Sequence, residues 1–466
     1  MNDFLKRWLS VLLVIIIGYG IIVLVSQNVY QFNPQYLVET SILKNKSFAE
    51  PIEIISPEKK IKAYLYEEHS NPIVSLAFVL TEAGAAYEPD DKKGIGTLLS
   101  SQLLKGAGKY KMAQFHDILE QKAIQIDFDN TKDDFQGSLK FIKKDLDIAA
   151  QMLNQALTAP LFEAKFVQQG KADLTSLYLR QRENADFLIA TEAFRQLFLN
   201  HPYQNNRIGD PKTHRRLSAA DMREFMRRHF VQNRLIVGIS GDLTPSEAGV
   251  LLDKAFANLP HVAQGTRLSP TIAKISEPDY HLSKKLQQNI GLFFGTGPQR
   301  LSEDFYPLMI AMQIFSGSGL TSRVQKACRE KEGLTYGVYG GIINFDKADL
   351  IYGRFSSTAD NFEQLKQIIK EEWLKMAEKG IREQELEQAK NYMIASDALR
   401  YADIENISET LVYMQKMHLG LDYLQKRNTY IQNVTLEQVN QALKKYFKPE
   451  NMRFMTIGET DNAKNN

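Results

Sequence analysis

The residue types that most often bind metals or perform catalysis form no intact motif in this chain of 466 residues. It has eight histidines and a single cysteine, Cys328, which excludes intrachain disulfides and cysteine-cluster metal sites. No pair of histidines has the spacing that places two zinc ligands on one face of a helix. His116 and Glu120 are four residues apart on a predicted helix, but a third ligand is missing, so we interpret them as a surface pair. The glycines of Gly94–Gly108 have the wrong spacing for a dinucleotide-binding loop.

The overall charge also narrows the class of protein. Lys and Arg total 57 against 55 Asp and Glu, a formal net charge of +2, and 44% of the residues are hydrophobic. A nucleic-acid-binding protein is normally much more basic, either overall or along one stripe. We therefore expect a globular chain with sizeable cores and no nucleic-acid partner.

The first thirty residues differ from the rest. Trp8–Val25 is a run of eighteen residues without a charge, just long enough to span a bilayer as a helix. Lys6 and Arg7 precede it and the next charge is Glu39, so the positive-inside rule places the body of the protein outside the cytoplasm. With only one cysteine, the chain fits a bacterial periplasm. The sequence predicts a single-pass signal anchor in the bacterial inner membrane; a cleaved signal peptide and a buried helix remain alternatives.

The body contains two stretches of the same design, about 217 residues apart. Each has a hydroxyl N-cap, Ser218 or Thr435, followed three residues later by an acid or amide, then an amphipathic helix. Each helix leads through a polar turn into a predicted strand, Leu235–Ser240 or Arg453–Ile457. This similarity indicates an internal duplication.

The remaining patterns complete an α+β prediction: two homologous domains, each a mainly antiparallel sheet packed with long helices, after an N-terminal transmembrane helix. The predicted domain boundaries are residues 1–30 for the cytoplasmic tip and anchor, 31–260 for the first domain, 261–284 for a linker, and 285–466 for the second domain. The further predicted strands are Pro72–Leu80, Ala123–Phe128 and Asn289–Phe294, and the long helices are Lys143–Leu157, Lys165–Asn200, Asn361–Lys379 and Glu383–Gly420.

Three stretches, read in order, resemble the pitrilysin/insulinase family of zinc metallopeptidases. They are EAGAAYEPDDKKGIGTLLSSQLLKGAG from Glu82, HPYQNNRIGDPKTHRRLSAADMREFMRRHFVQNRLIVGISGDL from His201, and SGSGLTSRVQKACREKEGLTYGVYGG from Ser316. The resemblance spans about residues 50–460, everything except the apolar segment.

The resemblance implies a zinc helix, and this chain departs from the family there. Active members place two histidines and a glutamate on one helix, with the glutamate activating a zinc-bound water. The corresponding positions here are Thr97, Ser100 and Ser101, and the position of the family's distal glutamate ligand falls near Tyr178. Neutral hydroxyls do not replace imidazole ligands, so we expect this chain to bind no cofactor of its own.

A second feature of the family is present. Active members carry an Arg and a Tyr, seven residues apart, in the second domain, and Arg329 and Tyr336 have that spacing here. By resemblance, they contact the carbonyl groups of a peptide and stabilise a developing oxyanion. Without the resemblance, they are interpreted as a solvated Arg at a helix end and a packed Tyr.

These two features together indicate a division of labour between two chains. We expect a zinc-free, peptide-binding subunit of a membrane-anchored heterodimeric metallopeptidase, inactive alone, with zinc on a homologous partner subunit. By resemblance, an extended or unfolded peptide adds to a sheet edge at Ala123–Asn130. The main alternative is a non-catalytic scaffold or interaction protein with the same fold, and a third is an independent hydrolase with a relocated site.

Overall fold

The computed structural model describes residues 50–262, 267–317, 322–329, 334, 337–401 and 403–459. The strands are β1 (Ile52–Ile55), β2 (Lys62–Glu67), β3 (Ile73–Leu80), β4 (Gly106–Ala107), β5 (Tyr110–Lys111), β6 (Gln125–Asn130), β7 (Phe135–Ile142), β8 (Leu235–Gly241), β9 (Tyr280–Ser283), β10 (Asn289–Thr296), β11 (Gly337–Asn344), β12 (Asp349–Ser357) and β13 (Arg453–Gly458). The α-helices are α3 (Ile95–Gln102), α4 (Met112–Gln121), α5 (Leu146–Thr158), α6 (Ala164–Gln181), α7 (Ala185–Leu197), α8 (Pro211–Arg216), α9 (Ala219–His229), α10 (Pro245–Ala255), α11 (Phe305–Ser316), α12 (Arg323–Arg329), α13 (Ala359–Lys379), α14 (Glu383–Arg400), α15 (Ile404–Lys416), α16 (Tyr423–Gln432) and α17 (Leu436–Tyr446). The prediction of a mixed α+β fold is confirmed.

The predicted anchor, Trp8–Val25, lies outside the described residues. Within the ranges given above, no helix combines the length and the apolar character needed to cross a bilayer.

The two large sheets share one strand plan. The first has the order β1-β2-β8-β3-β7-β6, and the second, read in the matching direction, has the order β9-β13-β10-β12-β11. In each sheet one pair is parallel, β2 with β8 and β9 with β13, whereas the other pairs are antiparallel. This shared plan is what an internal duplication produces.

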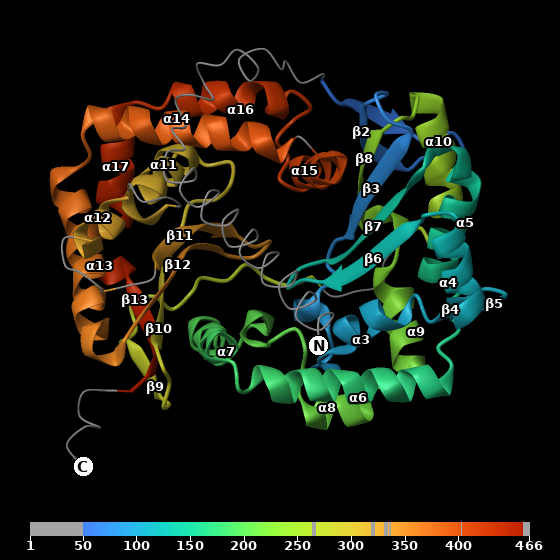
Figure 1. Cartoon of the computed structure of the whole chain (residues 1–466), viewed down its shortest axis with the longest axis horizontal. Coiled ribbons are helices and arrows are strands. Elements are labelled where there is room, and N and C mark those ends of the chain that lie inside the picture. Colours follow the sequence, from blue (N-terminus) through green and yellow to red (C-terminus); the bar gives the residue numbers. More distant parts are fainter. Residues whose placement is uncertain are drawn as a thin grey trace, which may run out of the picture.

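Each sheet lies between helices of its own half and one helix from the other half (Figure 1). Helices α5 and α10 cover the first sheet on its outer face, and α15, from the second half of the chain, lies on its inner face. The second sheet mirrors this arrangement, with α11, α13 and α17 behind it and α7 from the first half in front. Strand β10 is therefore apolar on both faces: Ile290, Leu292 and Phe294 pack with α7, whereas Phe293 joins the outer core.

Helices α7 and α15, which pack on the sheet of the other half, each begin inside a segment that the sequence predicted to be one uninterrupted helix. Those two predictions were therefore wrong. The predicted helix Lys165–Asn200 is divided into α6 and α7, and Asn184 caps α7 by accepting a hydrogen bond from the Phe187 backbone N–H at 3.2 Å. The predicted helix Glu383–Gly420 is divided into α14 and α15, and Asp403 caps α15 through the Glu405 N–H at 3.0 Å. Such Asn and Asp side chains compete with the helical backbone bonds, which is why they start helices more often than they continue them.

Small residues allow α15 to approach the first sheet closely. The Ser408 hydroxyl on α15 lies 3.0 Å from the Ser75 hydroxyl on β3. A Cβ atom added to Gly238 on β8 would lie 2.2 Å from the Ser408 carbonyl oxygen, so only glycine fits at that position. The Ser240 hydroxyl donates to the Ile404 carbonyl at 2.5 Å. Helix and sheet are thereby held at backbone contact.

An ionic cluster closes the seam between the halves at the end of α15. Lys416 forms ion pairs with Asp134, in the β6–β7 turn, and at 2.9 Å with Asp346, in the β11–β12 turn. The side chains are mostly buried, with exposed fractions of 17% for Lys416, 8% for Asp134 and 19% for Asp346. Next to them, Tyr203 donates its hydroxyl to Asp133 at 2.5 Å. One lysine thus connects the turns of both sheets.

The remaining strands differ slightly from expectation. Strand β6 begins at Gln125 instead of the predicted Ala123, because Ala123 has a left-handed backbone with φ of 50° and ends the preceding turn. Strand β9 lies inside the segment 261–284, which the sequence assigned to a linker, and pairs in parallel with β13 at the edge of the second sheet.

Candidate functional site

Helix α3 carries three of the predicted site positions, and a buried carboxylate fixes where it begins. Gly94, at the N-cap, has φ of 91°, and the Glu88 carboxylate accepts the Gly94 N–H at 2.8 Å and the Gly96 N–H at 2.9 Å. The same carboxylate accepts the Asn130 side-chain amide of β6 at 3.2 Å. Burial raises the pKa of Glu88 to about 7. Glu88 therefore joins the start of α3 to the edge strand of the first sheet.

The hydroxyls at positions 97, 100 and 101, which the family resemblance aligns with zinc ligands, donate hydrogen bonds to backbone carbonyls. Thr97 donates to the Arg207 carbonyl at 2.7 Å, Ser100 to the Thr97 carbonyl at 2.9 Å and Ser101 to the Leu98 carbonyl at 2.7 Å. The spacing of residues 97, 100 and 101 puts these side chains on one face of the helix. Their protons are occupied within the fold, and neutral hydroxyls are not ligands from which structural or catalytic zinc sites are built.

Tyr178 lies on α6, which packs against α3. Its ring meets the His214 ring edge-on, with centroids 6.2 Å apart and an interplanar angle of 87°. His214 Nε2 lies 2.7 Å from the carbonyl oxygen of Ile208, the residue after the Arg207 that accepts the Thr97 bond. Burial lowers the pKa of His214, which keeps the ring neutral at pH 7. The structure thus places Tyr178 in the same corner of the first half as α3, with its ring packed against His214.

This corner does not suit zinc. In the part of the chain that the structure describes, no group of three or more His, Cys, Asp and Glu side chains is arranged to hold a metal ion. The predicted positions supply three hydroxyls and a phenol, whereas a catalytic zinc site requires imidazole, carboxylate or thiolate ligands. No step involving zinc on this chain can be built from these residues.

The second predicted pair is described only in part. Arg329 is the last residue of α12, in the second half, and its side chain is outside what the structure describes. Tyr336 lies outside the described residues. Their predicted contacts with a peptide stay a prediction.

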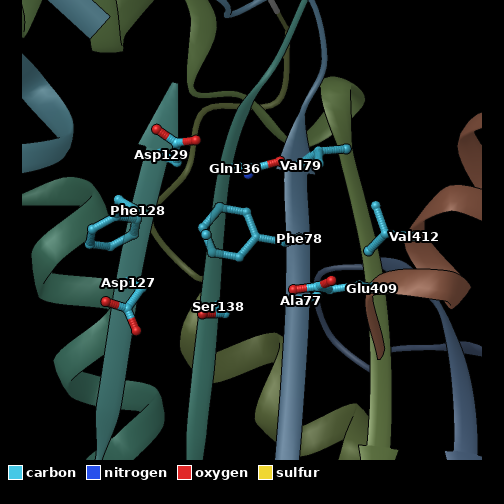
Figure 2. Close-up of a pocket in the computed structure, with 11 residues that line it drawn as sticks. Ala77, Phe78, Val79, Asp127, Phe128, Asp129, Gln136, Ser138, Glu409 and Val412 are labelled. Atoms are coloured by element: carbon cyan, nitrogen blue, oxygen red, sulfur yellow. The ribbon is translucent and has the colours of Figure 1, made fainter. Parts of the chain in front are cut away.

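The edge of the first sheet borders a hollow on its inner side. Strand β6 is the last strand of the sheet and pairs only with β7 within the described sheet. A cavity of about 330 Å³ is lined by residues of β6, β7 and β3 and by Glu409 and Val412 of α15, as Figure 2 shows. Asp127 and Asp129 of β6 line it as well, and Asp129 is paired with Arg207 at 2.9 Å.

Sequence reasoning missed these acids, although a signal was present. Asp127 and Asp129 alternate with Ile126 and Phe128, the pattern of a strand with one face against the core and one against solvent. Glu409 could not be linked to them, because the break between α14 and α15 sends its helix onto the other half of the molecule.

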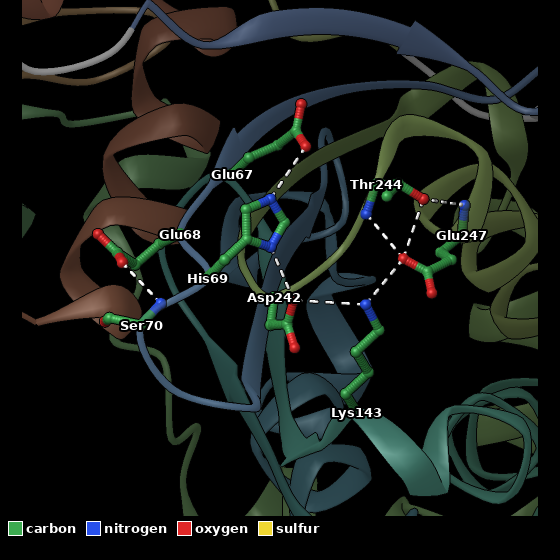
Figure 3. Close-up of polar contacts among 8 residues, drawn as sticks. All are labelled: Glu67, Glu68, His69, Ser70, Lys143, Asp242, Thr244 and Glu247. Carbon is green, nitrogen blue, oxygen red and sulfur yellow. Dashed lines mark hydrogen bonds and ion pairs between the residues drawn. The ribbon is translucent and has the colours of Figure 1, made fainter.

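A separate polar network surrounds His69, after the end of β2 (Figure 3). His69 lies 2.7 Å from Asp242 and 3.3 Å from Glu67, and Lys143 bridges Asp242 and Glu247 at 3.3 Å and 3.0 Å. The hydrogen bond with Asp242 raises the pKa of His69. Because Lys143 already bridges two of the carboxylates and the side chains are partly exposed to solvent, we interpret this network as structural.

Comparisons with known proteins agree with this geometry. Residues 64–209 match the family described as insulinase (peptidase family M16), and residues 216–393 match the peptidase M16 inactive domain. A non-peptidase homologue, YmxG of Helicobacter pylori, is 26% identical over 411 residues, covering 86% of this chain and 92% of the relative. Mitochondrial-processing peptidase subunit alpha-1 of Dictyostelium discoideum is 18% identical over 251 residues, covering 52% of this chain and 38% of that subunit. The crystal structure of a peptidase M16 inactive domain from Pseudomonas fluorescens superposes with a TM-score of 0.82 at 22% identity, covering 88% of this chain and 98% of the other.

Proposed function

The chain belongs to the M16 (insulinase) peptidase family, and on that premise we propose that it is the zinc-free, peptide-binding subunit of a membrane-anchored heterodimeric metallopeptidase. In this proposal the N-terminal segment anchors it in the bacterial inner membrane and the body lies in the periplasm. A homologous partner subunit carries the zinc.

The observation that carries the proposal is the state of α3. The helix has a carboxylate cap at its N-terminus and packs against β6, whereas positions 97, 100 and 101 hold hydroxyls bonded to backbone carbonyls. A relative covering most of this chain is named a non-peptidase homologue, and the second matching domain is described as inactive. The likeness to a processing-peptidase alpha subunit, named as one subunit of an enzyme, supports an assembly with a second chain.

The peptide-binding part of the proposal rests on β6. An edge strand offers unpaired backbone N–H and C=O groups to an added strand, which gives affinity with little demand on sequence. The cavity beside β6 leaves room for side chains of such a strand. Arg329 and Tyr336 are proposed to act on the peptide held at the partner's zinc, by the stabilisation of an oxyanion that the family resemblance implies.

The test compares the partner alone with the pair. The proposal predicts a neighbouring gene that encodes a family member with a His-x-x-Glu-His helix. The full chain is purified with and without that member, and hydrolysis of an unfolded peptide is followed. We expect the pair to be faster than the partner alone, and Arg329→Ala to lower kcat of the pair without preventing association. Arg215→Ala, which removes an exposed guanidinium on α8, is the control.

The alternative outcome is also defined. If the two chains associate but the pair is no faster than the partner alone, the chain is a scaffold. If Arg329→Ala and Arg215→Ala pairs have the same kcat, Arg329 has no part in hydrolysis.

A further inference from the structure

A second hollow, at the seam between the halves, is lined by two cationic residues, Arg300 and Lys347, that form no ion pair among the described residues. Its volume is about 570 Å³, and its walls come from both halves: Thr81 follows β3 and Ile236 lies in β8, whereas Arg300, Lys347 and His418 come from the second half. We refer to it below as the seam hollow.

Arg300 is buried, with 7% of its surface exposed, yet it has no carboxylate partner among the described residues. Its Nε donates to the Tyr413 hydroxyl at 2.7 Å, and its Nη2 to the hydroxyls of Tyr423 at 3.1 Å and Tyr306 at 3.4 Å. The guanidinium carbon also lies 4.1 Å from the centre of the Phe305 ring. Buried arginines are normally paired with an acid, because neutral dipoles and rings offset only part of the cost of burying a charge.

The other charges of the seam hollow do not supply the missing acid. Asp346 is paired with Lys416 at 2.9 Å, and Asp349 accepts the Asn344 amide at 2.5 Å. Lys347 is fixed through its backbone N–H, which donates to the Tyr203 hydroxyl at 3.0 Å, while its ammonium has no ion-pair partner in the part of the chain described. Arg300 and Lys347 thus line one cavity, and neither forms an ion pair with the two acids that also line it.

We propose that the seam hollow binds a carboxylate of the bound peptide, either its C-terminus or an acidic side chain. The location favours a peptide as the source. Lys416 lines the hollow and also contacts Asp134, in the turn that follows β6, so the hollow lies at the Asn130 end of the strand to which a peptide would add. This inference rests on the proposed function, because it assigns part of the same peptide's recognition.

Two forms of one peptide test the inference. A fluorescently labelled peptide without acidic side chains is prepared with a free C-terminal carboxylate and with a C-terminal amide, and binding to the full chain is measured by anisotropy. A third form carries one internal Asp and a C-terminal amide. We expect the form with the C-terminal amide and no Asp to bind about tenfold more weakly than the carboxylate form, because it loses one charge-assisted contact. The amide form with an internal Asp regains binding if the hollow accepts an acidic side chain. Equal affinities of all three would overturn the inference.

Substitution of Lys347 links the effect to this hollow. Lys347→Glu reverses one of the two free charges and should remove the preference for the carboxylate form. Lys444→Glu makes the same change on the exposed face of α17 and should leave the preference intact. Lys347 is used because Arg300 also packs against three tyrosines, so that its replacement could unfold this region. A preference that survives Lys347→Glu would also overturn the inference.

Failure of the proposed function gives a different result. If no form of the peptide binds, the proposal that this chain binds peptides is wrong. The affinity of the seam hollow for an oxyanion is then tested by calorimetric titration with inorganic phosphate. Saturable binding that is lost in Lys347→Glu but kept in Lys444→Glu supports an oxyanion site. Absence of binding to the unmodified chain overturns it.

Discussion

Replacement of Lys416 by methionine tests whether charge holds the two halves together at their seam. Methionine keeps most of the length of the lysine stem but removes the ammonium, so Asp134 and Asp346 lose their shared counter-charge. All three side chains are less than one-fifth exposed. Removal of one member of a buried ionic cluster typically costs 3–5 kcal/mol, and the residual exposure here favours the lower end. We expect the free energy of unfolding to fall by about 3 kcal/mol at pH 8.

The pH dependence distinguishes a lost charge from lost packing. Burial raises the pKa of Asp134 from 3.8 to about 6. A carboxyl with a raised pKa stabilises the folded chain most below 3.8, and this contribution is lost as the pH rises through about 6. At pH 5 Asp134 is largely protonated and no longer needs Lys416, so the cost of Lys416→Met should fall to roughly half its value at pH 8.

Urea unfolding followed by circular dichroism at pH 5 and pH 8 measures both effects. Lys254→Met is the matched control, because Lys254 pairs with Asp147 at 2.6 Å where both side chains are largely exposed. Such surface pairs contribute less than about 1 kcal/mol. A loss in Lys416→Met no larger than in the control, or one equally large at both pH values, would refute the electrostatic account of the seam.

Three further outcomes are expected. Because the pKa of Glu88 is raised from 4.5 to about 7, the free energy of unfolding should decrease by about 2.5 kcal/mol as the pH rises from 5 to 8, and urea titrations of Glu88→Gln should lack that component. Gly238→Ala would place a Cβ atom 2.2 Å from the Ser408 carbonyl and should lower the free energy of unfolding by about 2 kcal/mol; a stable variant would contradict the close packing of α15. His69 has a pKa raised above 6.5 by Asp242, so its stabilising contribution is present below 6.5 and is lost as the pH rises through its folded value; an NMR titration that gives an unshifted pKa would contradict the contact.

Local signals in the sequence identified much of the fold. The capping residues Ser218 and Thr435 do begin helices, each accepting a backbone N–H three residues on at 3.2 Å. The apolar run Pro72–Leu80, predicted to be a strand, forms β3 (Ile73–Leu80), which lies inside its sheet and is buried on both faces. These features depend on neighbours within one turn or one strand, where composition and period are decisive.

The exchange of helices between the halves could not be predicted in the same way. The sequence of α7 or α15 does not indicate that its apolar face packs on the sheet of the other half. The clues are Asn184 and Asp403, which interrupt long helical patterns, and the small residues of β3 and β8. The need for small residues there is explained only by the folded structure, in which α15 packs closely against both strands. Such contacts join positions more than a hundred residues apart, for which one sequence offers no register.

The candidate site likewise contains one feature that the sequence predicted and one that only the folded structure shows. The expectation that positions 97, 100 and 101 carry no zinc ligands comes from the sequence, because it requires only the identity of the residues that the resemblance aligns with the family's zinc ligands. The seam hollow cannot be predicted from the sequence, since its distinguishing feature is that Arg300 is surrounded by tyrosine hydroxyls where a buried arginine usually has an acid. Whether a buried arginine has an acidic partner becomes known only from the folded structure.

Glu88 bears on the choice between a peptide-binding subunit and a simple scaffold. Its carboxylate is fully enclosed, and burial raises its pKa to about 7, so that its charged form reduces stability at neutral pH. A helix needed only to fill space could be anchored by an apolar residue at lower cost. What the carboxylate adds is position: it joins the Gly96 N–H of α3 to the Asn130 amide of β6, and a Cβ atom on Gly96 would lie 2.5 Å from that amide's carbon. The fold therefore holds α3 tightly against the edge strand β6, which we take as support for the proposed peptide-binding subunit over a simple scaffold.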